Sequence, residues 1–105
     1  MRALPISIPQ EALAEFCKRH QVRNVALFGS VLRDGFGPAS DVDVLVEFDP
    51  QARHDLWDLF YMKEELERLF GRTVDLVNRE ALEQSRNWIR RRAILESAEI
   101  VYAAG

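Results

Sequence analysis

The 105-residue sequence has few of the features that secreted, membrane-spanning or nucleic-acid-binding proteins need. Its single cysteine, Cys17, excludes a disulfide within the chain, and its spacing from Leu13 and Phe16 predicts a buried position on a helix. The first ten residues contain two prolines and no long apolar run, so we expect neither a signal peptide nor a membrane-spanning helix there. These absences predict a cytoplasmic protein.

Positive charge is also in short supply. Lys and Arg number 14 against 17 Asp and Glu, which gives a formal net charge of −3 and a sequence pI near 5.4. Proteins that grip a nucleic-acid backbone usually present a basic surface. We therefore expect no direct nucleic-acid binding, and we expect any phosphate to be held through metal ions rather than by a field of lysines.

What is present is the composition of a folded domain. Hydrophobic residues make up 48% of the chain and charged residues 30%, which is typical of globular proteins. The length is close to the commonest domain size, so we expect a single domain over residues 1–105.

Apolar spacing and turn residues predict alternating helices and strands. Ser7 and Gln10 form a capping-box pattern before the first helix, and Asn78 is a candidate N-cap. The ending EIVYAAG fits either a short strand or a frayed tail. The predicted elements are a helix over 8–20, a strand over 25–28, a short helical segment over 31–33, a strand over 42–48, a helix over 55–70, a strand over 73–77, and one or two helices up to about residue 98.

This order predicts an α/β (α+β) fold in which helices cover one face of a small mixed β-sheet. Two aspartates, Asp41 and Asp43, stand one residue apart at the start of the strand over 42–48. Side chains alternate between the faces of a strand, so the two carboxylates point to the same side. Two charges about 4–5 Å apart repel by roughly 3–4 kcal/mol at an effective dielectric constant near 20.

A metal ion would remove that repulsion, and a third aspartate, Asp75, lies in the apolar run TVDLV. Oxygen ligands without nearby His or Cys favour Mg²⁺ or Mn²⁺ over zinc. Two such ions bridged by Asp41 and Asp43 would clamp a triphosphate and lower the pKa of an attacking hydroxyl, and Asp75 would accept its proton.

The turn before these aspartates predicts a seat for phosphate. Gly29 allows the backbone to approach a ligand closely. Ser30 begins a helical segment whose free N–H groups attract anions.

The stretch GSVLRDGFGPASDVDVLVEF resembles the signature of the DNA polymerase β-like nucleotidyltransferase superfamily: a Gly-Ser turn followed by an Asp-x-Asp pair in an apolar strand. TVDLV resembles the strand that carries the third carboxylate in that superfamily. The size of the chain and its ILESAEIVY ending are similar to the minimal nucleotidyltransferases (MNT), which are paired with HEPN-domain toxins in toxin–antitoxin modules.

The resemblance implies the polymerase β-like fold and a set of site residues. Gly29, Ser30 and Arg33 would bind the nucleotide phosphates, although Asp34 stands where many members have glycine. Catalysis and the binding of two Mg²⁺ ions would fall to the aspartate triad Asp41, Asp43 and Asp75.

By the same resemblance, the chain would be an adenylyltransferase that uses ATP as donor. It would transfer AMP to a tyrosine hydroxyl of a HEPN-type toxin and thereby act as its antitoxin, in a hetero-oligomer with that toxin. A second hypothesis is a non-catalytic nucleotide-binding module that neutralises a partner by contact. A third is transfer to a small molecule, for which the sequence shows no substrate domain.

Two other groups of residues have bland and functional interpretations. The arginines of the last predicted helix, Arg86, Arg90, Arg91 and Arg92, are either solvated and paired with residues such as Glu96, or contact nucleotide or an acidic partner surface. In the helix over 55–70, core packing would account for Leu56, Leu59 and Phe60, whereas Trp57 and Tyr61 would face a dimer or partner surface.

Overall fold

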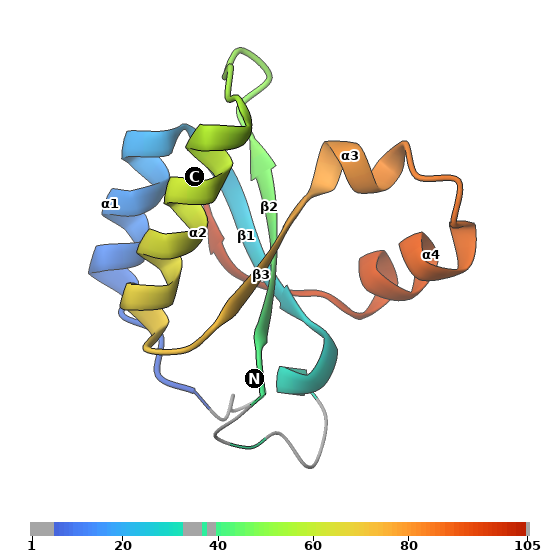
Figure 1. The fold of residues 1–105 in the computed structure, drawn as a ribbon, viewed down its shortest axis with the longest axis horizontal. Helices are drawn as coiled ribbons and strands as arrows, with labels where there is room; N and C mark the ends of the chain where they lie inside the picture. Colours follow the sequence, from blue (N-terminus) through green and yellow to red (C-terminus); the bar gives the residue numbers. More distant parts are fainter. Residues whose placement is uncertain (1–5, 33–36, 38–39, 105) are drawn as a thin grey trace.

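The structure is a computed structural model that describes residues 6–32, 37 and 40–104. Figure 1 shows a central twisted sheet with helices on both sides. In chain order the elements are α1 (Gln10–His20), β1 (Val22–Phe28), the 3₁₀ turn η1 (Gly29–Leu32), β2 (Val42–Phe48), α2 (Leu56–Phe70), β3 (Val74–Asn78), α3 (Arg79–Glu83), α4 (Trp88–Ser97) and β4 (Glu99–Ala103).

The four described strands form one mixed sheet in the order β3-β2-β1-β4. β2 and β3 run parallel and are connected by α2, whereas β1 pairs antiparallel with both β2 and β4. Parallel neighbours need such a crossover, so the helix between them follows from the topology. The pairing of β4 with β1 shows that the EIVYAAG segment forms a strand, and the mixed sheet predicted from the sequence is confirmed.

The helices divide into two pairs on opposite faces of the sheet (Figure 1). α1 and α2 cover the main hydrophobic core, and α3 and α4 cover a smaller one. The prediction that helices cover one face is therefore incomplete, because the strands have apolar residues on both faces. The smaller cluster consists of Ala26, Phe28, Leu45, Leu82 and Ile94.

The helix ends show which capping predictions hold. α1 begins at Gln10 with Pro9 as N-cap and no side-chain cap, so the capping box predicted from Ser7 is wrong. Ser7 lies two residues before the N-cap, too early to bond the first turn. Asn78 does cap α3, its side chain accepting from the Glu80 N–H at 2.9 Å.

The α2 helix has its own capping box and an apolar face that is only partly buried. Asp55 and Asp58 bond each other's backbone N–H at its start. Its core-facing residues lie one turn apart and include Met62, Leu66 and Phe70. The expectation that Leu56 and Phe60 pack in the core is wrong: they are 82% and 49% exposed, because they lie off the face that contacts the sheet.

Trp57 and Tyr61 are also exposed, as expected for residues outside the core. Whether a partner covers them stays a prediction. Across the described residues, no helix combines the length and the apolar character needed to span a membrane.

Candidate functional site

Two of the predicted aspartates lie opposite each other where β2 and β3 begin. Asp43 is in register with Asp75 across the parallel β2–β3 ladder, and on its other side it is in register with Phe28. Phe28 is the last residue of β1, so η1 begins beside Asp43. The sheet thus brings together the Gly-Ser turn and two carboxylates that are more than 30 residues apart in the chain.

Gly29 allows the turn and the carboxylate to approach each other. Its φ is +75°, in the left-handed region, and a Cβ added there would overlap Oδ2 of Asp43. Only glycine avoids both the conformational strain and this clash. The neighbour at Gly29 is the Asp43 side chain, and the predicted close approach to a ligand stays a prediction.

Ser30 contributes its backbone and its hydroxyl. Its backbone N–H donates to the carboxylate of Asp43, so the N–H that the sequence interpretation left free for phosphate has a partner here. The Ser30 hydroxyl lies 3.4 Å from the carbonyl oxygen of Asp41, to which it donates a long hydrogen bond. A phosphate-binding role for Ser30 stays a prediction.

The surroundings of Asp43 disfavour its charged form. Burial raises the pKa of its carboxyl, and the charges of Asp75 and, more weakly, Asp41 raise it further. The Ser30 N–H and the charge of Arg90 act in the opposite direction without cancelling the effect. This crowding of like charge on a half-buried carboxylate is the condition that a bound cation relieves.

Asp41 stands outside this pair. It precedes the first residue of β2, and its side chain is exposed, as is that of Asp75. Within residues 6–32, 37 and 40–104, no three His, Cys, Asp or Glu side chains converge into a group that could hold a metal ion. The structure therefore brings Asp43 and Asp75 together, with Asp41 close enough to affect the pKa of Asp43. Arg33 and Asp34 lie outside the described residues.

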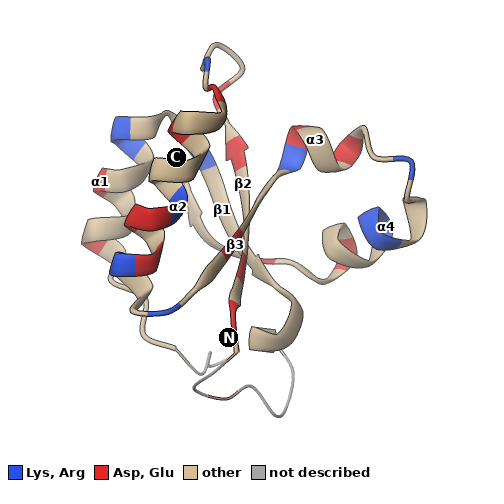
Figure 2. Ribbon diagram, in the orientation of Figure 1, with Lys and Arg blue, Asp and Glu red and all other residues tan. Residues whose placement is uncertain are grey.

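Two arginines lie near the site: one belongs to the basic cluster for which the sequence left contact with nucleotide open, and the other was missed. Arg90 of α4 lowers the pKa of Asp43 through its charge, so part of the basic cluster reaches the site. Figure 2 shows acidic residues on β2 and β3 and basic residues on α4. The other arginines of that helix follow the bland interpretation: Arg92 pairs with Glu96 at 2.9 Å, and Arg91 donates to the Ser85 carbonyl.

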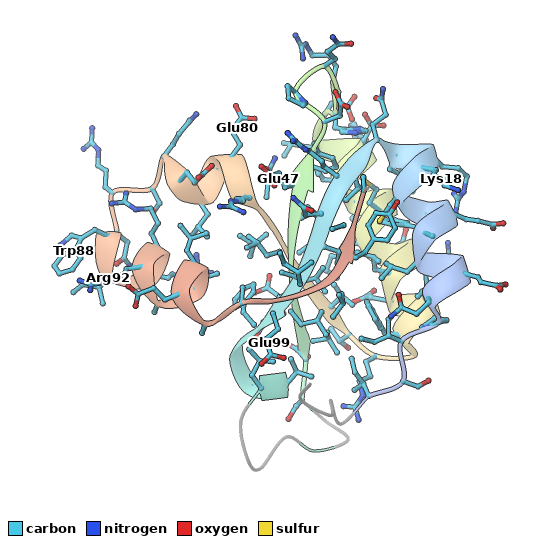
Figure 3. All side chains as sticks on the ribbon, turned by 180° about the vertical axis from the view of Figure 1, so that it is seen from behind. Lys18, Glu47, Glu80, Trp88, Arg92 and Glu99 are labelled. Atoms are coloured by element: carbon cyan, nitrogen blue, oxygen red, sulfur yellow. The ribbon has the colours of Figure 1, made fainter. Side chains whose placement is uncertain are left out.

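Figure 3, viewed from behind, shows Trp88 and Arg92 on the side of α4 that points away from the sheet.

The second arginine near the site is Arg72, which lies between α2 and β3. Its Nη1 donates to the carbonyl oxygens of Gly37 and Ser40, at 2.8 and 3.3 Å. Nothing in the local sequence pattern could have shown these long-range contacts.

Comparison with known proteins agrees with this arrangement. Residues 10–101 match the nucleotidyltransferase domain family. The chain is 38% identical over 68 residues to the protein adenylyltransferase MntA of Thermococcus cleftensis, a match that covers 65% of this chain and 67% of that protein. The matches to four curated relatives span 61–67% of their lengths.

Solved structures share the fold. A protein assigned as a minimal nucleotidyltransferase superposes with a TM-score of 0.65 at 33% identity, covering 86% of both chains. A toxin–antitoxin structure containing AMP-PNP superposes with a TM-score of 0.69 at 15% identity, covering 92% of this chain and 75% of that one. The MNT antitoxin bound to a tri-AMPylated HEPN toxin of Shewanella oneidensis has a TM-score of 0.60 at 15% identity, covering 90% of this chain and 70% of that one.

The extent of the family match, the 33% identical structure and the mixed four-stranded sheet lead to one assignment. The chain belongs to the nucleotidyltransferase domain family and has the polymerase β-like fold of the minimal nucleotidyltransferases.

Proposed function

We propose that the protein is a metal-dependent adenylyltransferase that moves AMP from ATP to a hydroxyl group on a partner protein. The observation that carries this proposal is the pairing of Asp43 with Asp75 beside the Gly29 turn, in a chain of the nucleotidyltransferase family. The naming of its relatives as protein adenylyltransferases supports AMP as the transferred group.

The carboxylates fit a hard divalent cation. Asp41, Asp43 and Asp75 offer only oxygen ligands, and the pKa of Asp43 is raised first by burial and then by the charge of Asp75. We propose that they hold Mg²⁺, or Mn²⁺ in its place, with two ions in the complete site. When bound, these ions would neutralise the charge of the triphosphate and acidify the attacking hydroxyl.

The chain's own residues would position the reactants. Asp75 is exposed and can accept the proton of the acceptor hydroxyl, whereas Asp43 is half-buried and fixed by the Ser30 N–H. The hydroxyl oxygen would form a bond to the α-phosphorus as the bond to pyrophosphate breaks in line. By the family resemblance, Gly29, Ser30 and Arg33 would hold the phosphates, and Gly29 lies directly beside the Asp43 carboxylate.

For the partner, we propose a HEPN-type toxin, modified on a tyrosine and silenced by the modification, so that this chain acts as the antitoxin in the cytoplasm. Support comes from the structural neighbours that are antitoxins in complex with such toxins. The exposed aromatic residues Trp57 and Tyr61 are compatible with a protein partner.

Co-expression with a HEPN-type toxin tests the proposal. The wild type should restore growth and add the mass of AMP to the toxin. Asp43→Asn removes a charge at nearly constant shape and should still bind the toxin without modifying it or restoring growth. Glu11→Gln, at an exposed position on α1, is the matched control and should behave as wild type. If Asp43→Asn protects cells while the toxin stays unmodified, the chain is a non-catalytic module that neutralises by contact.

A further inference from the structure

We propose that Arg72 is a positioning residue that holds Asp41 in place for the metal site. The proposal rests on the proposed function, because it concerns how the carboxylates of that site are arranged. Arg72 lies between the end of α2 and the start of β3, and it is not one of the residues that the family signature contains.

Arg72 connects the start of β3 to the segment that leads into β2. One guanidinium nitrogen, Nη1, donates to the carbonyl oxygens of both Gly37 and Ser40. These two residues also bond each other, through Ser40 N–H to the Gly37 carbonyl at 3.0 Å and Gly37 N–H to the Ser40 hydroxyl at 3.1 Å. Arg72 therefore binds two residues that are already bonded to each other.

A further bond lies just beyond Asp41. The Val42 N–H donates to the Thr73 carbonyl at 2.9 Å. Asp41 is thus held on both sides by the 72–73 segment: Ser40 before it is bound by the Arg72 side chain, and Val42 after it is bound by the Thr73 backbone. The two contacts come from adjacent residues of the connection between α2 and β3.

Asp41 needs such support because the sheet does not provide it. The β2–β1 ladder ends at the pair Asp43–Phe28, and the β2–β3 ladder begins at Val42–Val74. Asp41 lies outside both ladders, with an exposed side chain and one long bond from Ser30 to its carbonyl. On its N-terminal side, the described bonds that connect the Asp41 backbone to the connection before β3 are those that Arg72 donates to Gly37 and Ser40.

The start of β3 is anchored in turn by Glu67 of α2. Its carboxylate accepts the Val74 N–H at 3.0 Å and pairs with Lys63 at 3.0 Å. The Val74 N–H, and then Lys63, lower the pKa of Glu67, so the carboxylate that holds β3 stays ionised. Arg72 therefore joins the Asp41 segment to a position two residues before Val74 and three before Asp75.

The first test measures backbone protection in the protein without metal or nucleotide. Hydrogen exchange of the Ser40 and Val42 amides should accelerate roughly 10- to 100-fold in Arg72→Ala, the scale expected for loss of a charge-assisted hydrogen bond. Val25 and Leu27 amides in β1 should exchange at wild-type rates. Arg72→Lys keeps a cation that can donate to both carbonyls and should restore most of the protection.

The second test measures the metal requirement. In Arg72→Ala, Mn²⁺ binding followed by calorimetry should weaken about tenfold or more, the scale of a lost supporting contact around a metal ligand, and the Mg²⁺ concentration for half-maximal AMP transfer should rise to match. Arg72→Lys should recover. Arg68→Ala, which removes the same charge from an exposed position four residues earlier, should leave both unchanged.

Unchanged exchange at Ser40 and Val42, or a lower melting temperature with wild-type Mn²⁺ affinity, would overturn the proposal. Because exchange and Mn²⁺ binding need no turnover, they give an answer even if the wild type transfers no AMP. Failure of the proposed function and failure of this inference are therefore distinguishable.

Discussion

Gly29 and Asp43 adjoin so closely that any side chain at position 29 would overlap the Asp43 carboxylate. Gly29 begins η1 and Asp43 belongs to β2, so the contact joins the turn after β1 to the strand that carries the Asp-x-Asp pair. The site therefore depends on a glycine for space as well as for backbone conformation.

Substituting alanine at the two described glycines with positive φ separates these requirements. Gly29→Ala and Gly71→Ala, with φ of +75° and +68°, should each lose about 1 kcal/mol of unfolding free energy from backbone strain. Only Gly29→Ala should displace Asp43, because a Cβ at Gly71 has no atom within 4 Å. Urea unfolding and AMP-transfer rates check this. Equal activity in the two variants would show that the Gly29 contact does not matter to the site.

Asp43→Asn should have opposite effects on stability and activity. It removes a carboxylate whose pKa is raised by burial and by Asp75, so the metal-free protein should melt at a higher temperature. AMP transfer should fall by about a hundredfold or more, as for loss of a group that acts in the chemical step. Added Mg²⁺ should stabilise the wild type and not the variant; a lower melting temperature for metal-free Asp43→Asn would contradict this account.

The same carboxyl predicts how stability changes with pH. Because the pKa of Asp43 is raised in the folded state, the folded protein binds the proton more tightly than the unfolded chain does. Its contribution to stability is present below the ordinary carboxyl pKa and is lost as pH rises through the folded value. Urea unfolding across the acidic range should show this loss in the wild type, and the difference between wild type and Asp43→Asn should vanish at the acidic end.

Glu65 should show the opposite dependence. Arg19 and then His20 lower the pKa of this carboxyl by bonding it across α1 and α2. Its contribution is therefore present above the ordinary pKa and is lost as pH falls through the folded value. Glu65→Gln should cost about 1 kcal/mol near neutral pH.

The matched control for Glu65 is Glu96→Gln. Glu96 pairs with Arg92 on the exposed surface of one helix, where solvent screens such pairs and their contribution to stability is small. Chemical denaturation of both variants at neutral and acidic pH gives the comparison. An equal cost for the two substitutions would show that the contact between α1 and α2 adds nothing beyond an ordinary surface pair.

The lone cysteine should be unreactive in the folded protein. Cys17 is 1% exposed, and burial raises its pKa to about 12. Thiol reagents act on the thiolate, so alkylation should follow unfolding and match the urea transition. Rapid labelling of the native protein would contradict the burial of the α1 face.

Local patterns predicted the elements whose limits are marked by local residues. The strand predicted over 42–48 is confirmed, and its end could be predicted because Asp49 and Pro50 stop the apolar run. Gly71 was correctly placed just past the end of α2. β1 begins at Val22, three residues before the predicted start at 25. The prediction began too late because Arg23 and Asn24 interrupt the apolar run, although both residues belong to the strand. Where such a strand begins is determined by its pairing with neighbouring strands, which the sequence pattern does not show.

The site divides in the same way. The period of two predicted that Asp41 and Asp43 share one side of a strand, and Asp75 was added as the third carboxylate. The ladder places Asp43 opposite Asp75, whereas Asp41 precedes β2 and lies outside both ladders. The hydrogen bonds from Arg72 to Gly37 and Ser40 were missed because the acceptors are backbone carbonyls more than 30 residues away. Every residue has a backbone carbonyl, so the residue types at these positions do not indicate the contact. The wide apolar stripe of α2 was likewise assigned to the core, although Leu56 faces solvent.

The central claim is that the Asp43–Asp75 pair catalyses transfer of AMP to a protein. The measurement that tests it most directly is transfer of label from α-phosphate-labelled ATP, with Mg²⁺, into a lysate that contains a co-expressed HEPN-type toxin as the partner. Wild type and Asp43→Asn are compared in parallel. The account predicts a labelled band with wild type that disappears with Asp43→Asn and has the mass of the partner. A labelled band of equal strength with both proteins, or no label in either while the partner still binds, would contradict it.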